Sequence, residues 1–587
     1  MGAFFLARRD PMTDHAELVQ RLEECLHRQG FDEPCRVDQA SYSLRLYHKT
    51  NVAEENIVFR TGDDFAFSTG TLFYRCLFGR EAIGRLLDDF VPNRFDPRDL
   101  YGQFCVGINK GGSLYLLTDR LGLYNVYRDV HDRVYSSSFL AVLESLESVR
   151  VNAQSVYEYV FTGATYGNKT VFDEIELIAA DRTVRISEDI ATLPQKEWVV
   201  PAVVERSLDA HVEANLAAAR KWFSVIRNCF ENNVTTALSG GYDTRLMLAF
   251  LLEQGMKPSI YVYGGPENSD VRLASQIARA EGFPLAWVDR SALAKPGRDA
   301  FPESVEKTFY AFDGYPSDGI FDNGADLLTR IERSQGGKLQ LNGIGADYLR
   351  ECWLLADVRL TPLAFVKRCC RDFSPRSCTS LFCEKTYFEC LAEKLATSLG
   401  KTGPLLERTE MEHAWITFRC RYWVSRGASL NHRFGWALMP FLGLEIIEEC
   451  AKVPMKYRFY GRLQGRMIRE LSPALARHRS GYGHDFLHEA PLRRRFDEML
   501  ARLRKTYLPM LNAYRLKMML GRLYTTKILC PTCLQPDYVG SVVPATFPHL
   551  SEFFRVDQVV DLENYARVCT LEYLFQKCRA SLSRCGP

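Results

Sequence analysis

The segment TALSGGYDTR, Thr236 to Arg245, decides how the chain is interpreted. An apolar, strand-like run (NVTTAL) leads directly into Ser239, Gly240 and Gly241, and a helix-like run (DTRLMLAFLLEQG) follows at once. Two glycines let backbone N–H groups approach an anion closely, and the N-terminus of a helix carries a positive partial charge. The segment therefore predicts a phosphate-binding turn between a strand and a helix, of a kind different from the P-loop GxxxxGK[ST].

Acidic residues add a second element to this pattern. Ser239 and Thr244 can donate hydroxyl hydrogen bonds to a phosphate, but Asp243 would repel one unless a cation lay between them, which indicates Mg²⁺. A second acidic turn, LNGIGAD with Asp347, follows another predicted strand. Ligands of open parallel sheets bind beyond the carboxyl ends of the strands, so Asp243 and Asp347 are expected at one edge, where they could share magnesium. The alternative for each is an ordinary turn or helix-cap residue.

The surrounding residues alternate between helix and strand patterns. A helix pattern at 211–230 precedes the central strand, and the runs SIYVY (259–263) and LAWV (285–288) predict two further strands with a helix between them. Gly255 stands where a glycine caps the end of a helix. This order predicts parallel βαβ units with right-handed crossovers, and from about residue 351 the patterns become mostly helical.

Residues 1 to about 200 are instead rich in strand patterns. Two apolar runs flank Asn109-Lys110-Gly111-Gly112, which predicts a β-hairpin, and the polar pair His131-Asp132 predicts another turn. We therefore expect an α/β protein of two domains, residues 1–200 and residues 205–587.

Composition limits the class of protein without specifying a function. The chain has 587 residues, 47% hydrophobic and 25% charged, as folded globular proteins do. Its 74 Lys and Arg residues balance 72 Asp and Glu residues, for a formal net charge of +2, which gives no support for nucleic acid or an anionic membrane as a partner. The apolar run Ala3–Ala7 is too short for a signal peptide, and no run approaches the roughly 18 apolar residues of a spanning helix. A cytoplasmic protein is expected.

The 18 cysteines are scattered along the chain. Several stand in apolar runs, such as Cys105 and Cys450, where a reduced cysteine behaves as a small buried hydrophobe. Cys530 and Cys533 form a single CxxC, which leaves a structural pair, a redox pair or half of a metal site open.

Together these motifs resemble those of the asparagine synthetase family, whose synthetase domain is an N-type ATP pyrophosphatase. The similarity covers about residues 205–500 and extends weakly to the N-terminal strands YGQFCVGI and LYLLTDRLG. It implies an N-terminal glutaminase-like (Ntn-type) αββα sandwich followed by a parallel-sheet ATP-pyrophosphatase domain with a helical C-terminal part. The matching segments are LSGGYDT (238–244), YVYGGPENSD (261–270), LNGIGAD (341–347), MPFLG (439–443) and RHRSGYG (477–483).

The resemblance also implies roles for individual residues, with ATP and Mg²⁺ as the bound groups. Asp243 and Asp347 match the magnesium carboxylates. Arg479 falls where the family usually has a lysine against the pyrophosphate, and an arginine keeps that charge. The nucleotide residues implied are Leu238, Tyr263, Asn342 and Gly343 for adenine and ribose, and Ser239, Gly240, Gly241 and Thr244 for pyrophosphate.

The N-terminal region departs from the family. The family's glutaminase uses an N-terminal cysteine, whereas position 2 is Gly2, followed by Ala3, and Cys25 cannot supply an α-amine. Phe67-Ser68-Thr69-Gly70 replaces the family's asparagine–glycine motif. We therefore predict that this region does not hydrolyse glutamine.

A second departure concerns the general base. Ile344 stands where asparagine synthetases have a glutamate and β-lactam synthetases a tyrosine, and it cannot move protons. Asp313 and Asp318, in a loop expected to overhang the sheet edge, are the candidate bases. Tyr348 and His484 are also possible.

These features favour an ATP-dependent amide-bond-forming ligase that adenylates a carboxylate, releases pyrophosphate and passes the acyl group to an amine. β-Lactam synthetases and lasso-peptide cyclases are similar in having this domain without using glutamine, so the expected setting is natural product biosynthesis and the substrate a small molecule or peptide. The alternatives are an asparagine synthetase that uses free ammonia, a tRNA-modifying pyrophosphatase supported by the CxxC, and a non-catalytic nucleotide-binding protein supported by Ile344 and Gly443. The sequence leaves a homodimer open.

Overall fold

A parallel sheet of five short strands organises the C-terminal part of the molecule. The strands run in the order β17-β16-β15-β18-β19, and every neighbouring pair is parallel. The order of the strands along the chain reverses between β15 and β18, which makes this the switch point of the sheet. The bounds are β15 Val234–Ala237, β16 Ser259–Tyr263, β17 Leu285–Val288, β18 Leu339–Leu341 and β19 Trp436–Leu438.

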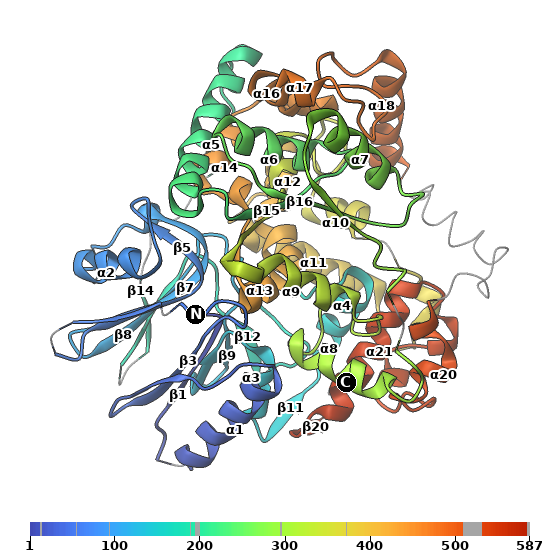
Figure 1. Ribbon diagram of the computed structural model, residues 1–587. Helices are drawn as coiled ribbons and strands as arrows, with labels where there is room; N and C mark the ends of the chain where they lie inside the picture. The colour runs from blue at the N-terminus through green and yellow to red at the C-terminus, as the bar shows by residue number, and fades with distance from the viewer. Residues whose placement is uncertain are drawn as a thin grey trace.

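Alternating side chains place different helices on the two faces of this sheet. Val234, Ile260 and Leu339 point to one face, where they join apolar clusters with α5 (Leu208–Phe230), α6 (Tyr242–Glu253), α7 (Ser269–Glu281) and α14 (Leu444–Ala451). The other face is approached by α9 (Ala325–Ser334) and α13 (Ser425–Phe434). Figure 1 shows the helices of the first face, α5, α6, α7 and α14, above the sheet. The strands and helices predicted around residues 211–288 are confirmed.

The computed structural model describes residues 1–583 except 12–13, 55, 61, 93, 188–189, 194–199, 294–295, 371–372 and 509–530. Within these residues the molecule is a mixed α/β protein with several sheets and many helices. No helix in this part of the chain is long and apolar enough to cross a membrane.

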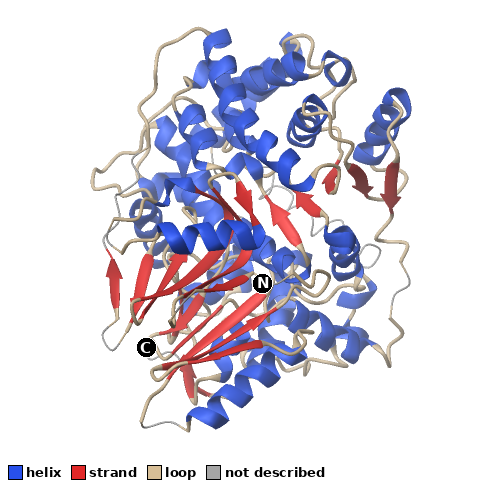
Figure 2. Ribbon diagram, turned by 60° about the vertical axis from the view of Figure 1, so that its left-hand side comes forward, coloured by secondary structure: helices blue, strands red, loops and turns tan. Residues whose placement is uncertain are grey.

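Two sheets face each other in the N-terminal part, where Figure 2 shows the red strands stacked. One has the order β12-β9-β10-β1-β3-β2 and the other β14-β13-β8-β7-β5-β4, with β6 beside β5. Their strands are β1 Ala3–Arg8, β2 Cys35–Asp38, β3 Tyr42–Tyr47, β4 Ile57–Phe59, β5 Phe65–Tyr74, β6 Leu77–Phe78, β7 Leu100–Lys110, β8 Ser113–Thr118, β9 Tyr127–Asp129, β10 Val134–Ser136, β12 Ile175–Leu177, β13 Thr183–Ile186 and β14 Ala191–Leu193.

Apolar clusters join these sheets into layers. Phe4 and Leu44 of one sheet pack with Phe67 and Leu116 of the other in a single buried cluster. Helix α2 (Gly79–Asp89) covers the outer face of the seven-stranded sheet, while α1 (His15–Arg28) and α3 (Phe139–Glu144) cover the six-stranded sheet. The order of layers is therefore helix, sheet, sheet, helix.

Both predicted turns are hairpins. Strands β7 and β8 pair from Cys105 to Lys110, and Gly111 and Gly112 between them have φ of 61° and 77°, which glycine adopts without strain. Strands β9 and β10 pair across His131-Asp132. Cys105 and Cys450 are buried in apolar clusters, as predicted.

The last described residues return to the N-terminal part. Strand β20 (Ser581–Ser583) pairs in parallel with β11 (Ser148–Arg150), and α21 (Leu562–Lys577) packs against α4 (Ala153–Thr162). The pairing of β20 with β11 joins residues on either side of the domain boundary predicted at residues 200–205. That boundary stays a prediction. Apart from short 3-10 turns, the other helices of the described residues are α8 Phe301–Ala311, α10 Pro362–Cys369, α11 Glu384–Ser398, α12 Arg408–Ala414, a π-helix η5 Trp415–Val424, α15 Met455–Arg458, α16 Arg462–Leu471, α17 Pro473–Ala476, α18 Leu492–Tyr507 and α20 Pro536–Val539.

Candidate functional site

The turn after β15 is held by its own hydroxyl groups. The Ser239 amide donates to Thr244 Oγ1 at 3.0 Å, and the two hydroxyls lie 2.9 Å apart. The Gly241 amide donates to Ser239 Oγ at 3.2 Å, and α6 begins at Tyr242. The predicted turn between a strand and a helix N-terminus is present, and its hydroxyls fix its shape.

Gly240 is the point of closest packing in this turn. Its amide donates to Asp270 Oδ1 at 2.9 Å, and its carbonyl accepts from the Gly481 amide at 2.9 Å. A Cβ at this position would lie 2.5 Å from Leu273 Cδ1 and 3.0 Å from the Gly481 nitrogen. A glycine is therefore required here by close approach, and the turn is joined directly to the segment 477–483.

Asp243 and Asp347 lie together at the edge of the sheet. Arg350 Nη2 donates to both, at 3.1 Å to Asp243 Oδ2 and 2.5 Å to Asp347 Oδ1, and Gln464 Nε2 donates to Asp243 Oδ1 at 2.8 Å. Burial, together with the charge of Asp243, raises the pKa of Asp347 to about 7. The position fits the strand order, because Asp243 follows β15 and Asp347 follows β18, the two strands at the switch point.

This pair of carboxylates fits Mg²⁺. Repulsion from Asp243 contributes to the raised pKa of Asp347, and a cation between the two carboxylates would relieve it. No group of three or more His, Cys, Asp or Glu side chains among the described residues could hold a metal. Mg²⁺ commonly uses one or two carboxylates and takes its other ligands from water and substrate phosphates, so two suffice.

Arg245 holds the basic segment against the turn. This buried side chain donates to the carbonyls of His478 at 2.7 Å and Arg479 at 3.1 Å, and its guanidinium lies 4.6 Å from the centre of the Phe486 ring. Burial lowers the pKa of Arg245 to about 10. The Arg479 side chain itself is exposed, so Arg245 fixes only its backbone.

A cavity of about 510 Å³ lies on the face of the parallel sheet that α9 and α13 approach. It reaches the sheet edge at which Asp243 and Asp347 lie. Its lining includes three residues singled out from the sequence, Tyr263, Asn342 and Asp318, and also Ile344. The guanidinium of Arg290 lies 4.0 Å from the centre of the Tyr263 ring. We call this space the edge cavity. Aromatic rings beside guanidinium groups suit a nucleotide, which has a flat base and anionic phosphates.

Other residues expected near the nucleotide have different surroundings. The Leu238 side chain is buried in the apolar cluster with Ile260 and Leu248, on the face away from the edge cavity. Gly343 lies close against Asp243. A Cβ at position 343 would be 3.1 Å from the Asp243 carbonyl carbon. Leu238 could therefore contribute only its backbone to a nucleotide site, and Gly343 positions a carboxylate.

Asp313 has a structural environment instead of a catalytic one. Its carboxylate accepts from Ser138 Oγ at 2.6 Å and from the amides of Phe139 at 2.7 Å and Leu140 at 3.1 Å, and it pairs with Arg433 at 3.2 Å. These contacts satisfy the N-terminus of α3 and leave the carboxylate buried. Asp313 is therefore excluded as the base, contrary to the expectation from the sequence.

Tyr348 and His484 are also engaged in contacts within the fold. Tyr348 is buried, its hydroxyl lies 3.3 Å from His413 Nδ1, and burial raises its pKa. His484 Nε2 lies 3.3 Å from the Tyr242 hydroxyl, and burial lowers the pKa of the imidazole. Asp318 differs from both because its carboxylate is exposed in the wall of the edge cavity.

Four residues of the site were not predicted: Arg245, Asp270, Arg350 and Gln464. Arg350 stands three residues after Asp347, a spacing that brings side chains together in a helical turn, so its charge could have been noticed. Gln464 comes from α16, more than two hundred residues after Asp243, and no local pattern relates the two. Of the CxxC pair, Cys530 lies outside the described residues and Cys533 is buried.

Comparisons with known proteins give little guidance. No protein-family model and no curated protein matches the chain. One similar structure is the glutamine phosphoribosylpyrophosphate amidotransferase of B. subtilis, solved with ADP and GMP. The match covers 49% of this chain and 65% of the amidotransferase chain, at 11% identity and a TM-score of 0.23. A structure described as the allosteric regulatory enzyme of purine biosynthesis matches 51% and 68%, at 12% identity and a TM-score of 0.23. These TM-scores are too low to assign a fold or an activity, so the site is interpreted from its own geometry.

Proposed function

We propose that this chain is an ATP-dependent ligase that forms amide bonds by adenylating a carboxylate. The observation that supports this most directly is the meeting of three features at one sheet edge. They are a glycine turn at the N-terminus of α6, the carboxylates Asp243 and Asp347, and the edge cavity. A phosphate, a divalent cation and a nucleoside would each find suitable chemistry there.

In the first step of the proposed reaction, a substrate carboxylate oxygen attacks the α-phosphorus of ATP. The bond from that phosphorus to the bridging oxygen breaks, and pyrophosphate leaves. Phosphate oxygens would replace Asp270 and Ser239 as acceptors of the Gly240 and Gly241 amides. Asp243 and Asp347 would hold Mg²⁺, which spreads the charge on pyrophosphate when bound. Arg479 would face the pyrophosphate from the segment that Arg245 fixes.

In the second step, an amine attacks the acyl carbon, the bond to AMP breaks, and the nitrogen loses a proton. Ile344 cannot accept this proton, whereas the exposed Asp318 carboxylate in the cavity wall can. Asp318 is therefore the base we favour.

We further propose that the chain is a member of the asparagine synthetase family without glutaminase activity. The helix–sheet–sheet–helix layers of the N-terminal part support a glutaminase-like (Ntn-type) origin. Gly2 is enclosed by backbone, since a Cβ would lie 3.0 Å from the His48 oxygen and the Lys49 Cα. The amine would then be free ammonia, a second substrate or part of the same molecule, in a cytoplasmic, biosynthetic setting.

The test follows pyrophosphate release from Mg·ATP with a panel of carboxylic acids. Pyrophosphate formed together with AMP supports adenylation, whereas ADP would contradict the mechanism. An Asp243→Ala variant should lose the activity, and an Asp209→Ala variant on the exposed start of α5 should keep it. Ammonia as the accepted amine would favour an asparagine synthetase, and AMP release that requires RNA would favour tRNA modification.

A non-catalytic nucleotide-binding protein is the second candidate. Two contacts favour it. Arg350 already neutralises the carboxylate pair, and Asp270 already accepts a hydrogen bond from the Gly240 amide. Calorimetry distinguishes the two candidates. The non-catalytic protein is favoured if ATP binds without dependence on Mg²⁺ and no acid causes release of pyrophosphate from ATP.

A further inference from the structure

Helix α18 turns a row of large apolar side chains toward solvent. Residues three and four positions apart fall on one side of a helix, and such a row normally faces the core of a globular protein. In α18 each member of the row is exposed, by 39 to 80% of its surface. We call this row the α18 stripe; it consists of Leu492, Phe496, Met499, Leu500, Leu503 and Tyr507.

The side of α18 that packs on the fold is polar. Arg502 is buried, and its Nε donates to Glu351 Oε1 at 2.8 Å, while its Nη2 donates to Glu498 Oε2 at 3.1 Å. The buried Thr506 hydroxyl accepts from the Ala356 amide at 2.9 Å. Breaking a buried ion pair is strongly destabilising, so these contacts fix the rotation of the helix and keep the α18 stripe outside.

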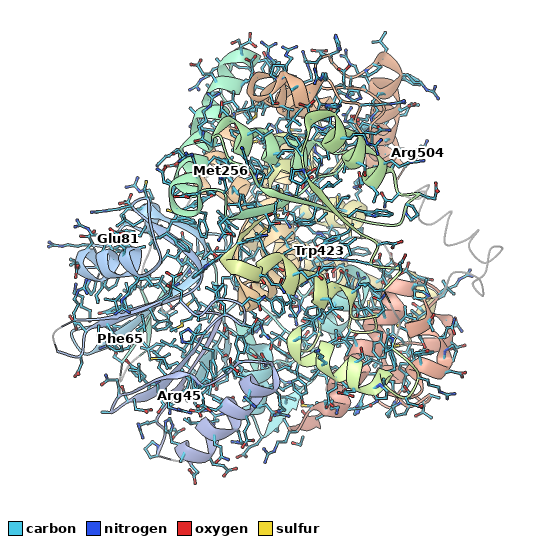
Figure 3. The ribbon with its side chains drawn as sticks, in the orientation of Figure 1. Arg45, Phe65, Glu81, Met256, Trp423 and Arg504 are labelled. Carbon is cyan, nitrogen blue, oxygen red and sulfur yellow. The ribbon has the colours of Figure 1, made fainter. Side chains whose placement is uncertain are left out.

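The position of α18 limits the shape of a partner. Figure 1 shows the helix at the upper right margin of the molecule, and Figure 3 labels its Arg504 at the same margin. The 16 residues of the helix are about 24 Å long. Because the opposite side is packed on the fold, a groove deep enough to enclose a helix could not close around α18. A flat surface could instead contact the whole length of the α18 stripe.

The charge of α18 specifies the partner further. The helix has six Lys and Arg residues against two Asp and Glu, an excess that the formal net charge of +2 for the whole chain conceals. Arg493 and Arg504 are exposed along one border of the α18 stripe, where Asp497 is also exposed, whereas Glu498 is paired. Residues 509–530 contain four Lys and Arg and no Asp or Glu. That segment, or a second copy of α18, would therefore meet like charge, and an anionic partner is complementary.

We propose that α18 lies on the surface of a membrane that contains anionic lipids. The α18 stripe would enter the boundary between headgroups and acyl chains, and Arg493 and Arg504 would lie at the level of the lipid phosphates. The contact would be peripheral, because no helix of the described residues could cross a membrane. This proposal does not depend on the proposed ligase activity.

The test is sedimentation of the whole chain with lipid vesicles. Vesicles of phosphatidylcholine with about one third phosphatidylserine should bind the protein about tenfold more tightly than vesicles of phosphatidylcholine alone, and added salt should weaken this binding. Phe496→Ser combined with Leu503→Ser should weaken it about tenfold, because apolar area is lost from the contact. Leu381→Ser combined with Leu405→Ser is the matched control and should change nothing, since the two pairs have the same exposed fractions, 55% and 42%.

A second pair of variants tests the charged border. Arg493→Gln combined with Arg504→Gln should reduce the preference for phosphatidylserine vesicles about tenfold. Lys307→Gln combined with Lys385→Gln, at exposed lysines of α8 and α11, should leave the preference unchanged. Circular dichroism checks that each variant folds. Equal binding to both kinds of vesicle, or binding that none of the α18 variants weakens, would overturn the proposal.

Absence of binding to either kind of vesicle would also overturn it, and further measurements would identify the occupant. Self-association of the parent in sedimentation that the substitutions in the α18 stripe abolish would assign the stripe to a second copy of the chain. Vesicle binding that appears only after residues 509–530 are replaced by a Gly-Ser linker would assign it to that segment. If neither is seen, an acidic protein replaces the membrane as the partner.

Discussion

Arg350 Nη2 lies 3.1 Å from Asp243 Oδ2, so a fixed positive charge already stands where two acidic turns meet. Both side chains are about three-quarters buried. Arg350 therefore stabilises the carboxylate pair on its own, and the proposed Mg²⁺ would have to compete with it or share the carboxylates with it.

Replacing this arginine should change both stability and metal response. Arg350→Met leaves two carboxylates facing each other, so the free energy of unfolding should fall by about 2 kcal/mol in Mg²⁺-free buffer. Added Mg²⁺ should raise the melting temperature of the variant more than that of the parent. Arg462→Met, which breaks an exposed pair with Glu489, is the control and should change little. An equal response to Mg²⁺ in parent and Arg350→Met would contradict this account.

Removing one of the carboxylates should separate activity from stability. Asp347→Asn relieves the repulsion that raises the pKa of Asp347 to about 7. In Mg²⁺-free buffer at neutral pH, the melting temperature of the variant should therefore be at least as high as that of the parent. Its pyrophosphate release should nevertheless fall by about a hundredfold or more, because half of the proposed metal site is lost. A variant that keeps normal activity would exclude Asp347 from the site.

A methyl group at Gly240 should disturb the turn. The Cβ of Gly240→Ala would meet Leu273 and the Gly481 nitrogen, so the segment 477–483 must move. We expect a loss of roughly 1–3 kcal/mol in the free energy of unfolding and at least a tenfold loss in pyrophosphate release. Gly297→Ala, where a Cβ meets nothing within 4 Å, should leave both unchanged. Equal behaviour of the two variants would show that the close contact is unimportant.

Glutamine should not be a nitrogen donor. Incubation with glutamine should release glutamate no faster than a blank without protein, because Gly2 carries no nucleophile. Gly2→Cys should not restore the activity, since a Cβ there would lie 3.0 Å from the His48 oxygen and the Lys49 Cα, so the backbone would have to shift to admit a thiol. Glutamate release by the parent at an ordinary enzymatic rate would refute the prediction.

Acid should destabilise the fold through His413. This imidazole is buried near Arg458, and burial and that charge lower its pKa to about 3. Between pH 3 and pH 6.5 the unfolded chain binds a proton at this site that the folded chain does not, so stability falls as pH falls through that window. The contribution is about 2 kcal/mol between pH 7 and pH 5. Urea unfolding at both pH values should show a smaller difference for His413→Gln than for the parent.

The regular elements near the sheet were predictable because their signals are local. The run VTTAL, the two glycines and the helix pattern after Asp243 each lie within a few residues. The short length of the run, its β-branched residues and the glycines that follow it distinguish this strand from the helix. The same holds for the hairpin at Gly111 and Gly112. That Asp243 and Asp347 lie at one edge followed from the parallel strands, whereas their contact depends on β15 and β18 being neighbours in the sheet.

Long-range partners were not predictable in the same way. Asp313 stands in a polar loop that favours exposure, but the fold places it at the N-terminus of α3 beside Arg433. Gln464 and Arg245 act on groups far away in sequence. The π-helix η5 has an apolar pattern that fits an ordinary helix, and only its packing reveals the wider turn.

The pairing of β20 with β11 has a consequence for biosynthesis. Residues 562–583 leave the ribosome about 400 residues after α4, which at 5–20 residues per second is a delay of roughly 20–80 s. Throughout this delay α4 and β11 lack the partners that bury them. The packing around α4 therefore cannot be completed until residues 562–583 have been made, and a chaperone that shields α4 would protect it from aggregation meanwhile.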